Sequence, residues 1–306
     1  MADELPQDAI EEDYRRFPEP LGPTVVLPDT SIEIVRVPGR RSPPQHVLFD
    51  FDGTLSLVRE GWPEVMVPMM VEVLAATGTG ESPAALRALA HDFVMELNGK
   101  QTIYQMIRLA EEVRARGGVP EDPVVYKHRY HERLMARIAS RREALRSGAI
   151  EAESMLVPHS LPMLAALIER GTTLYLASGT DEAFVREEAA LLGLTAYFGP
   201  HIYGAQDDYR TFSKALVIRR ILEENAVGGE TLLGFGDGYV EIANVVSAGG
   251  TAVAVASDET GRSGQVDAWK RQRLLGVGAH VVIPDFRDHS ALLAYLWGDE
   301  MTMPAG

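Results

Sequence analysis

The sequence predicts an α/β fold, a doubly wound parallel sheet with an inserted all-helical cap domain and a proline-rich N-terminal arm. Short apolar runs alternate with helical patterns over much of the chain, which is typical of parallel β-α-β units. One block of about 100 residues shows helical patterns only, far more than a normal crossover needs. Eight prolines fall within the first 45 residues, where they disfavour long helices.

Composition narrows the function classes. The chain has 306 residues, 46% of them hydrophobic, which is enough for one large domain or two ordinary ones. Its net charge of −15 argues against nucleic acid as a main partner, because phosphate backbones require clustered Lys and Arg. The absence of cysteine excludes disulfides and thiolate chemistry. No apolar run approaches the ~18 residues of a membrane helix, and the acidic N-terminus lacks a signal-peptide pattern. We therefore expect a cytoplasmic protein with no membrane partner, either a monomer or a homodimer.

The N-terminal arm is predicted to cover residues 1–45. Two apolar segments, 24–27 and 32–37, flank the turn-like sequence at 28–31. They predict a small β-hairpin or an extended arm lying on the main body. The arm could brace the core, cover the edge of the sheet or mediate a dimer, and the sequence leaves these roles open.

The α/β core is predicted at 46–57 and 157–306. Its buried strands are expected at 46–50, 173–177, 231–235, 251–256 and 280–283. Its helices are expected at 160–170, 181–192, 212–224, 239–248, 266–275 and 289–297. Right-handed crossovers place the carboxyl ends of all the strands at one edge of the sheet, where ligands bind.

The cap is predicted at 58–156, between the first two core strands. Four helices are expected there, at 62–77, 83–97, 102–116 and 123–146. Ser82 followed by Pro83 is a typical helix start, because serine caps the free N–H groups and proline suits the first helical position.

The first chemical motif is Asp50-Phe51-Asp52-Gly53-Thr54-Leu55, at the end of the first core strand. Strand alternation directs the side chains of Asp50 and Asp52 to one face. Two adjacent carboxylates need a cation or a shared proton, which suits a nucleophile and a general acid/base beside a divalent metal. The structural alternative is a plain Asp–Gly turn.

Two further motifs carry a hydroxyl and a lysine. Ser178 and Gly179 follow the second strand, where a hydroxyl and backbone N–H groups can hold a phosphoryl oxygen. The alternative is a helix N-cap at Thr180 or Asp181. Lys214 opens a helix, which opposes the helix dipole unless an anion lies nearby. The alternative is a solvated surface lysine.

The last motif is Gly234-Phe235-Gly236-Asp237-Gly238-Tyr239-Val240-Glu241. Asp237 ends a strand, and Glu241 lies one helical turn later. Two acids at this spacing repel each other without a cation, which is the form expected of a magnesium site with oxygen ligands. An Asp–Gly turn with an unrelated Glu is the alternative.

The four motifs, in this order, resemble the haloacid dehalogenase superfamily and its Rossmann-like core. The resemblance covers about 46–56 and 157–297, and the position of the cap resembles the helical-cap subclass, with phosphoglycolate phosphatase and β-phosphoglucomutase among its members. It implies that Asp50 is the nucleophile and Asp52 the acid/base, that Ser178 and Gly179 bind phosphate, and that Lys214 neutralises charge. It also implies a Mg²⁺ ion held by Asp50, Asp52, Asp237 and Glu241. The family's usual second acid is Asp, so direct contact between Glu241 and the metal is in question.

The resemblance implies a magnesium-dependent phosphatase that acts on a small phosphorylated metabolite through an aspartyl-phosphate intermediate. A sugar phosphate is the preferred substrate class. Asp52 favours phosphate-ester chemistry over the dehalogenase and phosphonate-cleaving branches. A phosphosugar mutase remains an alternative, because mutases share the Asp-x-Asp pair. A non-catalytic binding protein on this fold is the other, although such a protein would be expected to lose motif residues.

Substrate choice is expected to depend on the cap and the loop that leads into it. Arg59, Glu60 and Trp62 follow the first motif closely and are expected to line the entrance to the site. Lys100 joins two cap helices and is a candidate substrate contact. For both Lys100 and Lys127, however, a solvated side chain is the expected arrangement.

Overall fold

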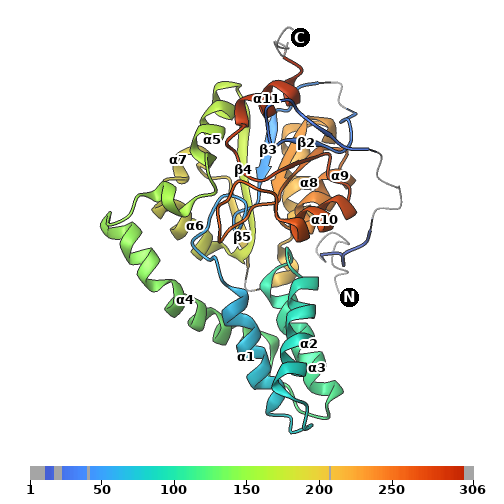
Figure 1. Cartoon of the computed structure of the whole chain (residues 1–306), viewed down its shortest axis with the longest axis vertical. Helices are drawn as coiled ribbons and strands as arrows, with labels where there is room; N and C mark the ends of the chain where they lie inside the picture. The colour runs from blue at the N-terminus through green and yellow to red at the C-terminus, as the bar shows by residue number, and fades with distance from the viewer. Residues whose placement is uncertain (1–10, 17–22, 40–41, 207, 300–306) are drawn as a thin grey trace.

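The computed structural model describes residues 11–16, 23–39, 42–206 and 208–299. In this part of the chain, an eight-stranded sheet has the order β1-β2-β8-β7-β6-β3-β4-β5 (Figure 1). The six strands from β8 to β5 are parallel. This arrangement confirms the predicted fold class.

The parallel strands are short and buried. They are β3 (His46–Phe49), β4 (Thr173–Asp181), β5 (Ile202–Ala205), β6 (Leu232–Gly236), β7 (Thr251–Val255) and β8 (Val281–Ile283). Strand β5 lies within a region where no strand was predicted. It has only four residues and forms one edge of the sheet, and Tyr203 and Gly204 interrupt its apolar pattern, so its pairing with β4 is a tertiary effect.

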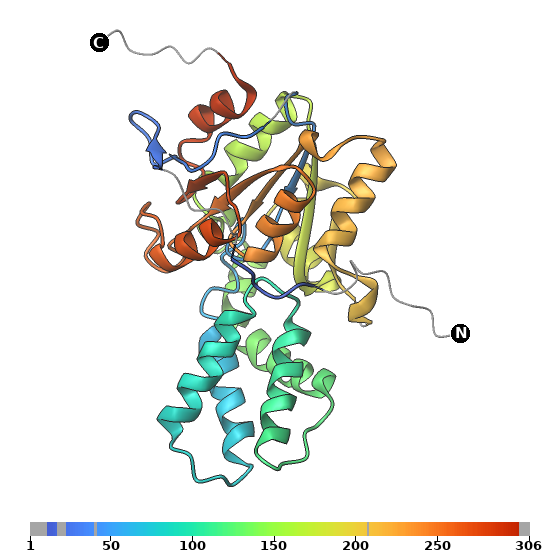
Figure 2. The ribbon, with the colours of Figure 1, turned by 90° about the vertical axis from the view of Figure 1, so that its right-hand side faces the viewer.

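Helices cover both faces of the sheet (Figure 2). One face packs on α5 (Ser160–Glu169), α6 (Glu182–Leu191), α7 (Thr195–Phe198) and α11 (His289–Trp297). The other packs on α8 (Lys214–Asn225), α9 (Tyr239–Ser247) and α10 (Ala268–Gly276). Strand β3 shows the division, since Val47 and Phe49 belong to the first apolar cluster and Leu48 to the second.

The described part of the N-terminal arm contains a β-hairpin, β1 (Val25–Val26) and β2 (Glu33–Ile34). Strand β2 pairs antiparallel with β8, so the hairpin extends the sheet. An ion pair between Glu33 and Arg271 of α10 fixes it there. The parts of the arm at 1–10, 17–22 and 40–41 lie outside the described residues.

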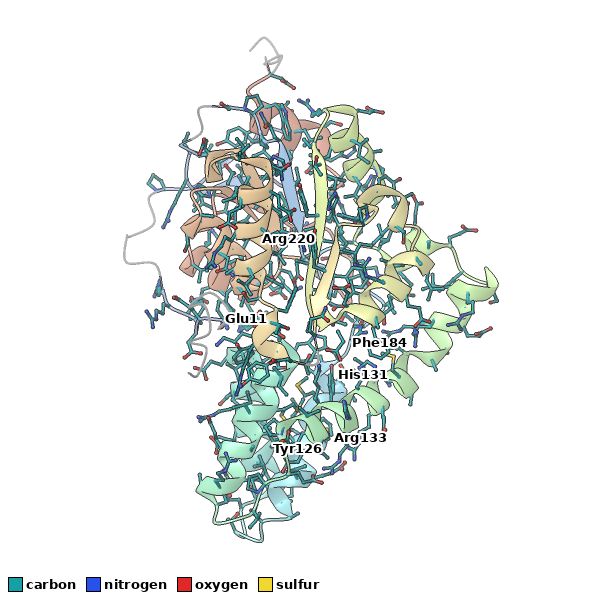
Figure 3. All side chains as sticks on the ribbon, turned by 180° about the vertical axis from the view of Figure 1, so that it is seen from behind. Glu11, Tyr126, His131, Arg133, Phe184 and Arg220 are labelled. Carbon is teal, nitrogen blue, oxygen red and sulfur yellow. The ribbon has the colours of Figure 1, made fainter. Side chains whose placement is uncertain are left out.

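Four helices follow β3 before the chain returns to β4: α1 (Pro63–Ala75), α2 (Pro83–Glu96), α3 (Thr102–Ala115) and α4 (Pro123–Ser147). The two connections to them run side by side, because Leu57 N donates to Met155 O at 2.8 Å and Val157 N donates to Leu55 O at 2.9 Å. Helix α4 also lies against α6, where the rings of His131 and Phe184 are in contact with their centroids 3.9 Å apart (Figure 3). The cap boundaries at 58 and 156 stay predictions.

A short N-terminal strap, residues 11–14, joins this helical block to the core. The Glu11 carboxylate accepts from Gln101 N at 2.7 Å, and Glu11 N donates to Tyr104 Oη at 3.1 Å. On the core side, Tyr239 Oη donates to Glu12 O at 3.1 Å. Among the described helices, none is long and apolar enough to cross a membrane.

Candidate active site

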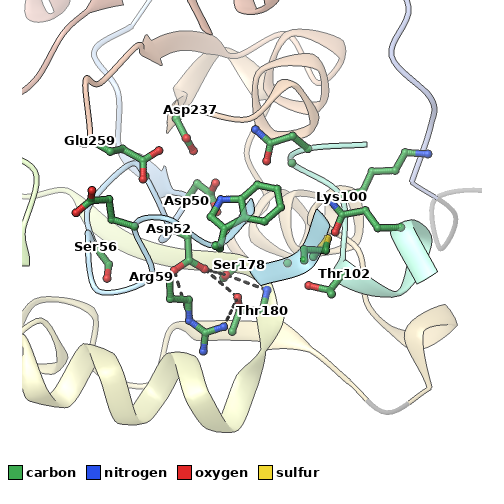
Figure 4. A pocket seen from close by; sticks show the side chains of 18 of the residues that line it. Asp50, Asp52, Ser56, Arg59, Lys100, Thr102, Ser178, Thr180, Asp237 and Glu259 are labelled. Atoms are coloured by element: carbon green, nitrogen blue, oxygen red, sulfur yellow. Dashed lines mark hydrogen bonds and ion pairs between the residues drawn. The ribbon is translucent and has the colours of Figure 1, made fainter. Parts of the chain in front are cut away.

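A small pocket lies between the carboxyl ends of the core strands and the cap (Figure 4). Its volume is about 100 Å³. All the sequence-predicted site residues except Glu241 line it: Asp50, Asp52, Arg59, Glu60, Trp62, Lys100, Ser178, Gly179, Lys214 and Asp237. The fold therefore brings residues from five separate segments to one place.

Asp50 directly follows β3 and is buried. Its backbone N–H donates to Phe235 O at 2.9 Å, which ties the first motif to the neighbouring strand β6. Burial raises the pKa of Asp50 to about 6, the Lys214 ammonium opposes this, and Asp237 adds to it. A pKa near 6 leaves this carboxyl group largely ionised at pH 7, the state in which a carboxylate can act as a nucleophile.

Lys214 reaches this carboxylate from the first turn of α8. Its Nζ lies 2.9 Å from Asp50 Oδ1, and it also contacts the Glu241 carboxylate. The side chain is buried, so the alternative of a solvated lysine is wrong. Ser213 caps the helix by accepting a hydrogen bond from Leu216 N. The cap fixes where α8 begins and therefore places Lys214 in its first turn.

Asp52 turns toward the end of β4. Its Oδ2 accepts from Thr180 Oγ1 at 2.8 Å and from Ser178 Oγ at 3.4 Å (Figure 4). Burial raises the pKa of Asp52 to about 7; Arg59 opposes this, and Glu188 and Asp50 add to it. A carboxyl group with a pKa near neutrality suits a general acid/base.

Thr180 was missed as a functional residue because it resembled a helix cap. The strand continues to Asp181, and neither Thr180 nor Asp181 caps α6 with its side chain. The usable signal was the pair of hydroxyls at Ser178 and Thr180, which strand alternation directs to one side.

Asp237 ends β6 and faces the first motif. Its carboxylate accepts from Thr54 Oγ1 at 3.3 Å. A Cβ added to Gly53 would lie 2.2 Å from Asp237 Oδ2, so only glycine permits this approach. Asp237 also pairs with Lys270 Nζ at 2.8 Å, and Lys270 pairs with Glu259 at 2.7 Å. Lys270 and Glu259 had no sequence signal, because neither belongs to a motif.

The oxygen donors of the pocket fit a hard divalent cation. The charge of Asp237 raises the pKa of Asp50, which indicates that these two carboxylates repel each other across the site. Mg²⁺ commonly takes one or two carboxylates together with water and phosphate oxygens. No cluster of three or more His, Asp or Glu side chains that could hold a metal by itself occurs in the described residues. Glu241 contacts Lys214 and does not line the pocket, so its role as a metal ligand stays a prediction.

Arg59 lines the pocket, where it is buried and held by Glu188. Two other expectations for the cap region, a solvated Lys100 and a solvated Lys127, are wrong. Lys100 is buried and pairs with Asp13 of the strap at 2.7 Å. Lys127 pairs with Asp181. These two lysines are therefore not solvated, because acidic groups distant in the sequence meet them.

The loop before α3 touches the core through glycines. A Cβ on Gly99 would lie 3.2 Å from the Cα of Gly238, and one on Gly179 would lie 2.9 Å from Lys100 O. Gly99 also has a φ of +100°, which side chains rarely adopt. The cap loop can close on the core only because these positions lack side chains.

Several solved structures share this architecture. A predicted phosphatase from Clostridium acetobutylicum is 16% identical, with 82% of this chain and 99% of that chain covered and a TM-score of 0.53. A β-phosphoglucomutase from Clostridium difficile is 12% identical, with 83% and 97% covered and a TM-score of 0.55. A predicted phosphoglycolate phosphatase from Haemophilus somnus 129pt is 16% identical, with 82% and 99% covered and a TM-score of 0.53. At these identities the similarity shows the fold alone.

A comparison with curated proteins gives no match. The family described as haloacid dehalogenase-like hydrolase matches residues 44–249, which include all four motifs and the intervening helices. This match spans more than half of the chain. The protein therefore belongs to the haloacid dehalogenase-like hydrolase family.

Proposed function

We propose that this protein is a magnesium-dependent phosphatase that hydrolyses a small phosphorylated metabolite through an aspartyl-phosphate on Asp50. One observation carries the proposal. The Lys214 ammonium lies 2.9 Å from the Asp50 carboxylate, in a pocket that Asp52 and Ser178 also line. A buried nucleophile, a fixed cation, a phosphoryl-binding hydroxyl and an acid/base are the groups that in-line phosphoryl transfer requires.

The steps follow from these side chains. Asp50 attacks phosphorus, and a new oxygen–phosphorus bond forms as the ester P–O bond breaks. The bonding electron pair leaves with the ester oxygen, which Asp52 protonates. Asp52 then takes a proton from water, whose oxygen attacks the phosphorus of the aspartyl-phosphate. The bond between Asp50 oxygen and phosphorus breaks, its electron pair returns to the Asp50 carboxylate, and inorganic phosphate is released. Lys214 balances charge on Asp50 and on the phosphoryl oxygens, and Ser178 donates to one of those oxygens.

Asp50 and Asp237 are the side chains that would hold Mg²⁺. When bound, the ion neutralises charge on the transferring phosphoryl group. The pocket's composition supports this assignment, since two mutually repelling carboxylates gain from a shared cation.

The substrate is inferred to be small. A cavity of about 100 Å³ is below the range of about 300–1,000 Å³ that drug-sized ligands occupy. Its polar lining, which includes Glu60, Asn98 and Lys100, suits a hydroxylated molecule. A sugar phosphate is therefore the preferred class, and the cap must move to admit it.

The test is a panel of phosphorylated metabolites assayed for phosphate release with Mg²⁺, with a chelator and with Asp50→Asn. We expect release from wild type with Mg²⁺ only, and a loss of at least about 10³-fold in Asp50→Asn, because that amide is a poor nucleophile. Val26→Ala, at an exposed position remote from the site, is the matched control and should retain activity. A folded and active Asp50→Asn variant would refute the proposal, as would isomerisation of a sugar phosphate without phosphate release, which marks a mutase.

A further inference from the structure

The guanidinium group of Arg59 contacts three side chains of the protein, those of Glu188, Thr180 and Asp52. Its Nε donates to Glu188 Oε2 at 3.0 Å, and its Nη2 donates to Glu188 Oε1 at 2.9 Å. Its Nη1 donates to Thr180 Oγ1 at 3.3 Å. The guanidinium also lies 3.7 Å from Asp52 Oδ1. Because each of its nitrogens is already bonded to a protein group, Arg59 is poorly placed to bind the substrate itself.

Glu188 fixes this arrangement from α6. Its side chain is fully buried, and its two oxygens take the guanidinium in a bidentate fork, the geometry that most constrains an arginine. A buried Glu without its partner would leave an uncompensated charge. The pair therefore anchors the loop after the first motif to a rigid core helix.

The hydrogen bonds continue to the acid/base. Thr180 Oγ1 receives the Arg59 Nη1 bond and donates its own hydrogen to Asp52 Oδ2 at 2.8 Å. The direction of these two hydrogen bonds is fixed, because an arginine side chain only donates and the Thr180 hydroxyl has one hydrogen to donate. Figure 4 shows Arg59, Thr180 and Asp52 linked in this order at the lower side of the pocket.

We propose that Glu188 and Arg59 are positioning residues that, through Thr180, hold the Asp52 carboxyl in the orientation from which it protonates the leaving oxygen. This inference rests on the proposed phosphatase function. The acid step transfers the Asp52 proton to the ester oxygen as the P–O bond breaks. A misaligned carboxyl group slows this step and leaves the attack by Asp50 intact.

Leaving-group dependence distinguishes this role from a structural one. An alkyl phosphate expels a strongly basic alkoxide and needs the acid, whereas p-nitrophenyl phosphate expels a stable phenolate and does not. General acid catalysis is worth about 10²–10⁴-fold. Asp52 also serves the later hydrolysis of the aspartyl-phosphate, which is common to both esters, so the test uses kcat/KM, which reports only the steps up to departure of the leaving group. Loss of the positioning pair should therefore depress kcat/KM for the alkyl ester much more than for the aryl ester.

The experiment measures kcat and KM of the full chain with Mg²⁺ on both esters. We expect Arg59→Met to lower kcat/KM about 10²-fold for the alkyl ester and less than about 10-fold for the aryl ester. Glu188→Gln should show the same pattern to a smaller degree. Arg116→Met is the matched control, because Arg116 forms a similar bidentate pair with Glu81 outside the pocket and should change neither value.

Thr180→Val provides a second test of the same hydrogen bonds if Arg59→Met does not fold. It removes only the hydroxyl that contacts Asp52, so we expect the same selective loss, and Thr180→Ser should restore alkyl-ester turnover. Equal losses of kcat/KM on both esters would overturn the inference and leave the proposed function standing. Absence of Asp50-dependent turnover in wild type on both esters would refute both.

Discussion

Two sets of carboxylates at the pocket each contact their own buried lysine. Lys214 contacts Asp50 and Glu241, whereas Lys270 contacts Asp237 and Glu259. Each cation offsets the repulsion between carboxylates that burial makes costly. The two acids of the last motif, Asp237 and Glu241, therefore have different neighbours, although they lie only four positions apart in the sequence.

This difference predicts separate effects on metal binding. Asp237→Asn should weaken Mg²⁺ or Mn²⁺ binding by at least about 10-fold, which corresponds to about 1.4 kcal/mol. Glu241→Gln should lower turnover by loosening Lys214 and change the metal Kd less than about threefold. Titration calorimetry measures the Kd, and an equal loss in both variants would show that Glu241 is a ligand after all.

Removal of the Lys270 ammonium should strengthen metal binding, in contrast to the loss of binding expected for Asp237→Asn. Its ammonium neutralises Asp237 at 2.8 Å, so it competes electrostatically with a divalent ion for that carboxylate. Lys270→Met should lower the metal Kd severalfold, roughly 0.5–1.5 kcal/mol. Arg271→Met, at the next position on α10 and paired with Glu33, serves as the control. A weaker metal affinity in Lys270→Met would contradict this expectation.

At the level of secondary structure, an aromatic cluster on one face of β3 supports the first motif. Phe49 stacks on Phe235 with ring centroids 4.7 Å apart and meets Phe198 and Phe286 at 6.0 and 6.2 Å. This cluster joins β3, β6, α7 and the segment before α11. Asp50 comes immediately after Phe49, so the cluster fixes the point from which the nucleophile projects.

Phe49→Ala should therefore destabilise the protein by about 3–5 kcal/mol, because it leaves a cavity in a closely packed cluster. Denaturant unfolding measures this change. Val26→Ala removes an exposed side chain and should stay within about 0.5 kcal/mol of wild type. A Phe49→Ala loss below about 1 kcal/mol would show that the cluster relaxes around the gap.

At the scale of the whole molecule, the strap holds the cap against the core. Glu11 accepts from Gln101 N on the cap side, while Tyr14 meets Tyr239 edge-on at 5.5 Å on the core side. Asp13 pairs with Lys100, which lines the pocket. Movement of the cap must break or carry these contacts.

Docking of the strap should weaken as pH rises. Burial is the main cause that raises the pKa of Glu11 from 4.5 to about 7, and the hydrogen bond from Gln101 opposes it. The docked state therefore holds the proton more tightly than the undocked state. Its stabilisation is complete below about pH 4.5 and is lost as pH rises through about 7, a difference of up to about 3 kcal/mol.

Thermal unfolding at pH 5 and pH 8 tests this. Glu11→Gln keeps an acceptor for Gln101 N and loses the charge, so its stability relative to wild type should increase from pH 5 to pH 8. Glu12→Gln, at an exposed neighbouring position, should show no such trend. A constant difference between Glu11→Gln and wild type at both pH values would contradict the expectation.

Much of the fold follows from local patterns in the sequence. Apolar runs, Gly and Asp at strand ends and the helical block between β3 and β4 depend on neighbours a few residues apart, and the structure has strands or helices at those places. Three of the motifs lie at strand ends and the fourth, with Lys214, opens a helix, so parallel β-α-β topology brings Asp50, Ser178, Lys214 and Asp237 to one edge.

No local sequence pattern predicts the contacts between side chains from distant segments. The partnership of Arg59 with Glu188 spans 129 positions, and that of Lys100 with Asp13 spans 87. Lys270 reaches Asp237 from a helix without a motif. Strand period and turn residues are local, so they could be read from the sequence, together with the chemical groups that stand at the strand ends. Which charges neutralise one another depends on burial and on distances between elements far apart in the sequence, so it became known from the three-dimensional structure.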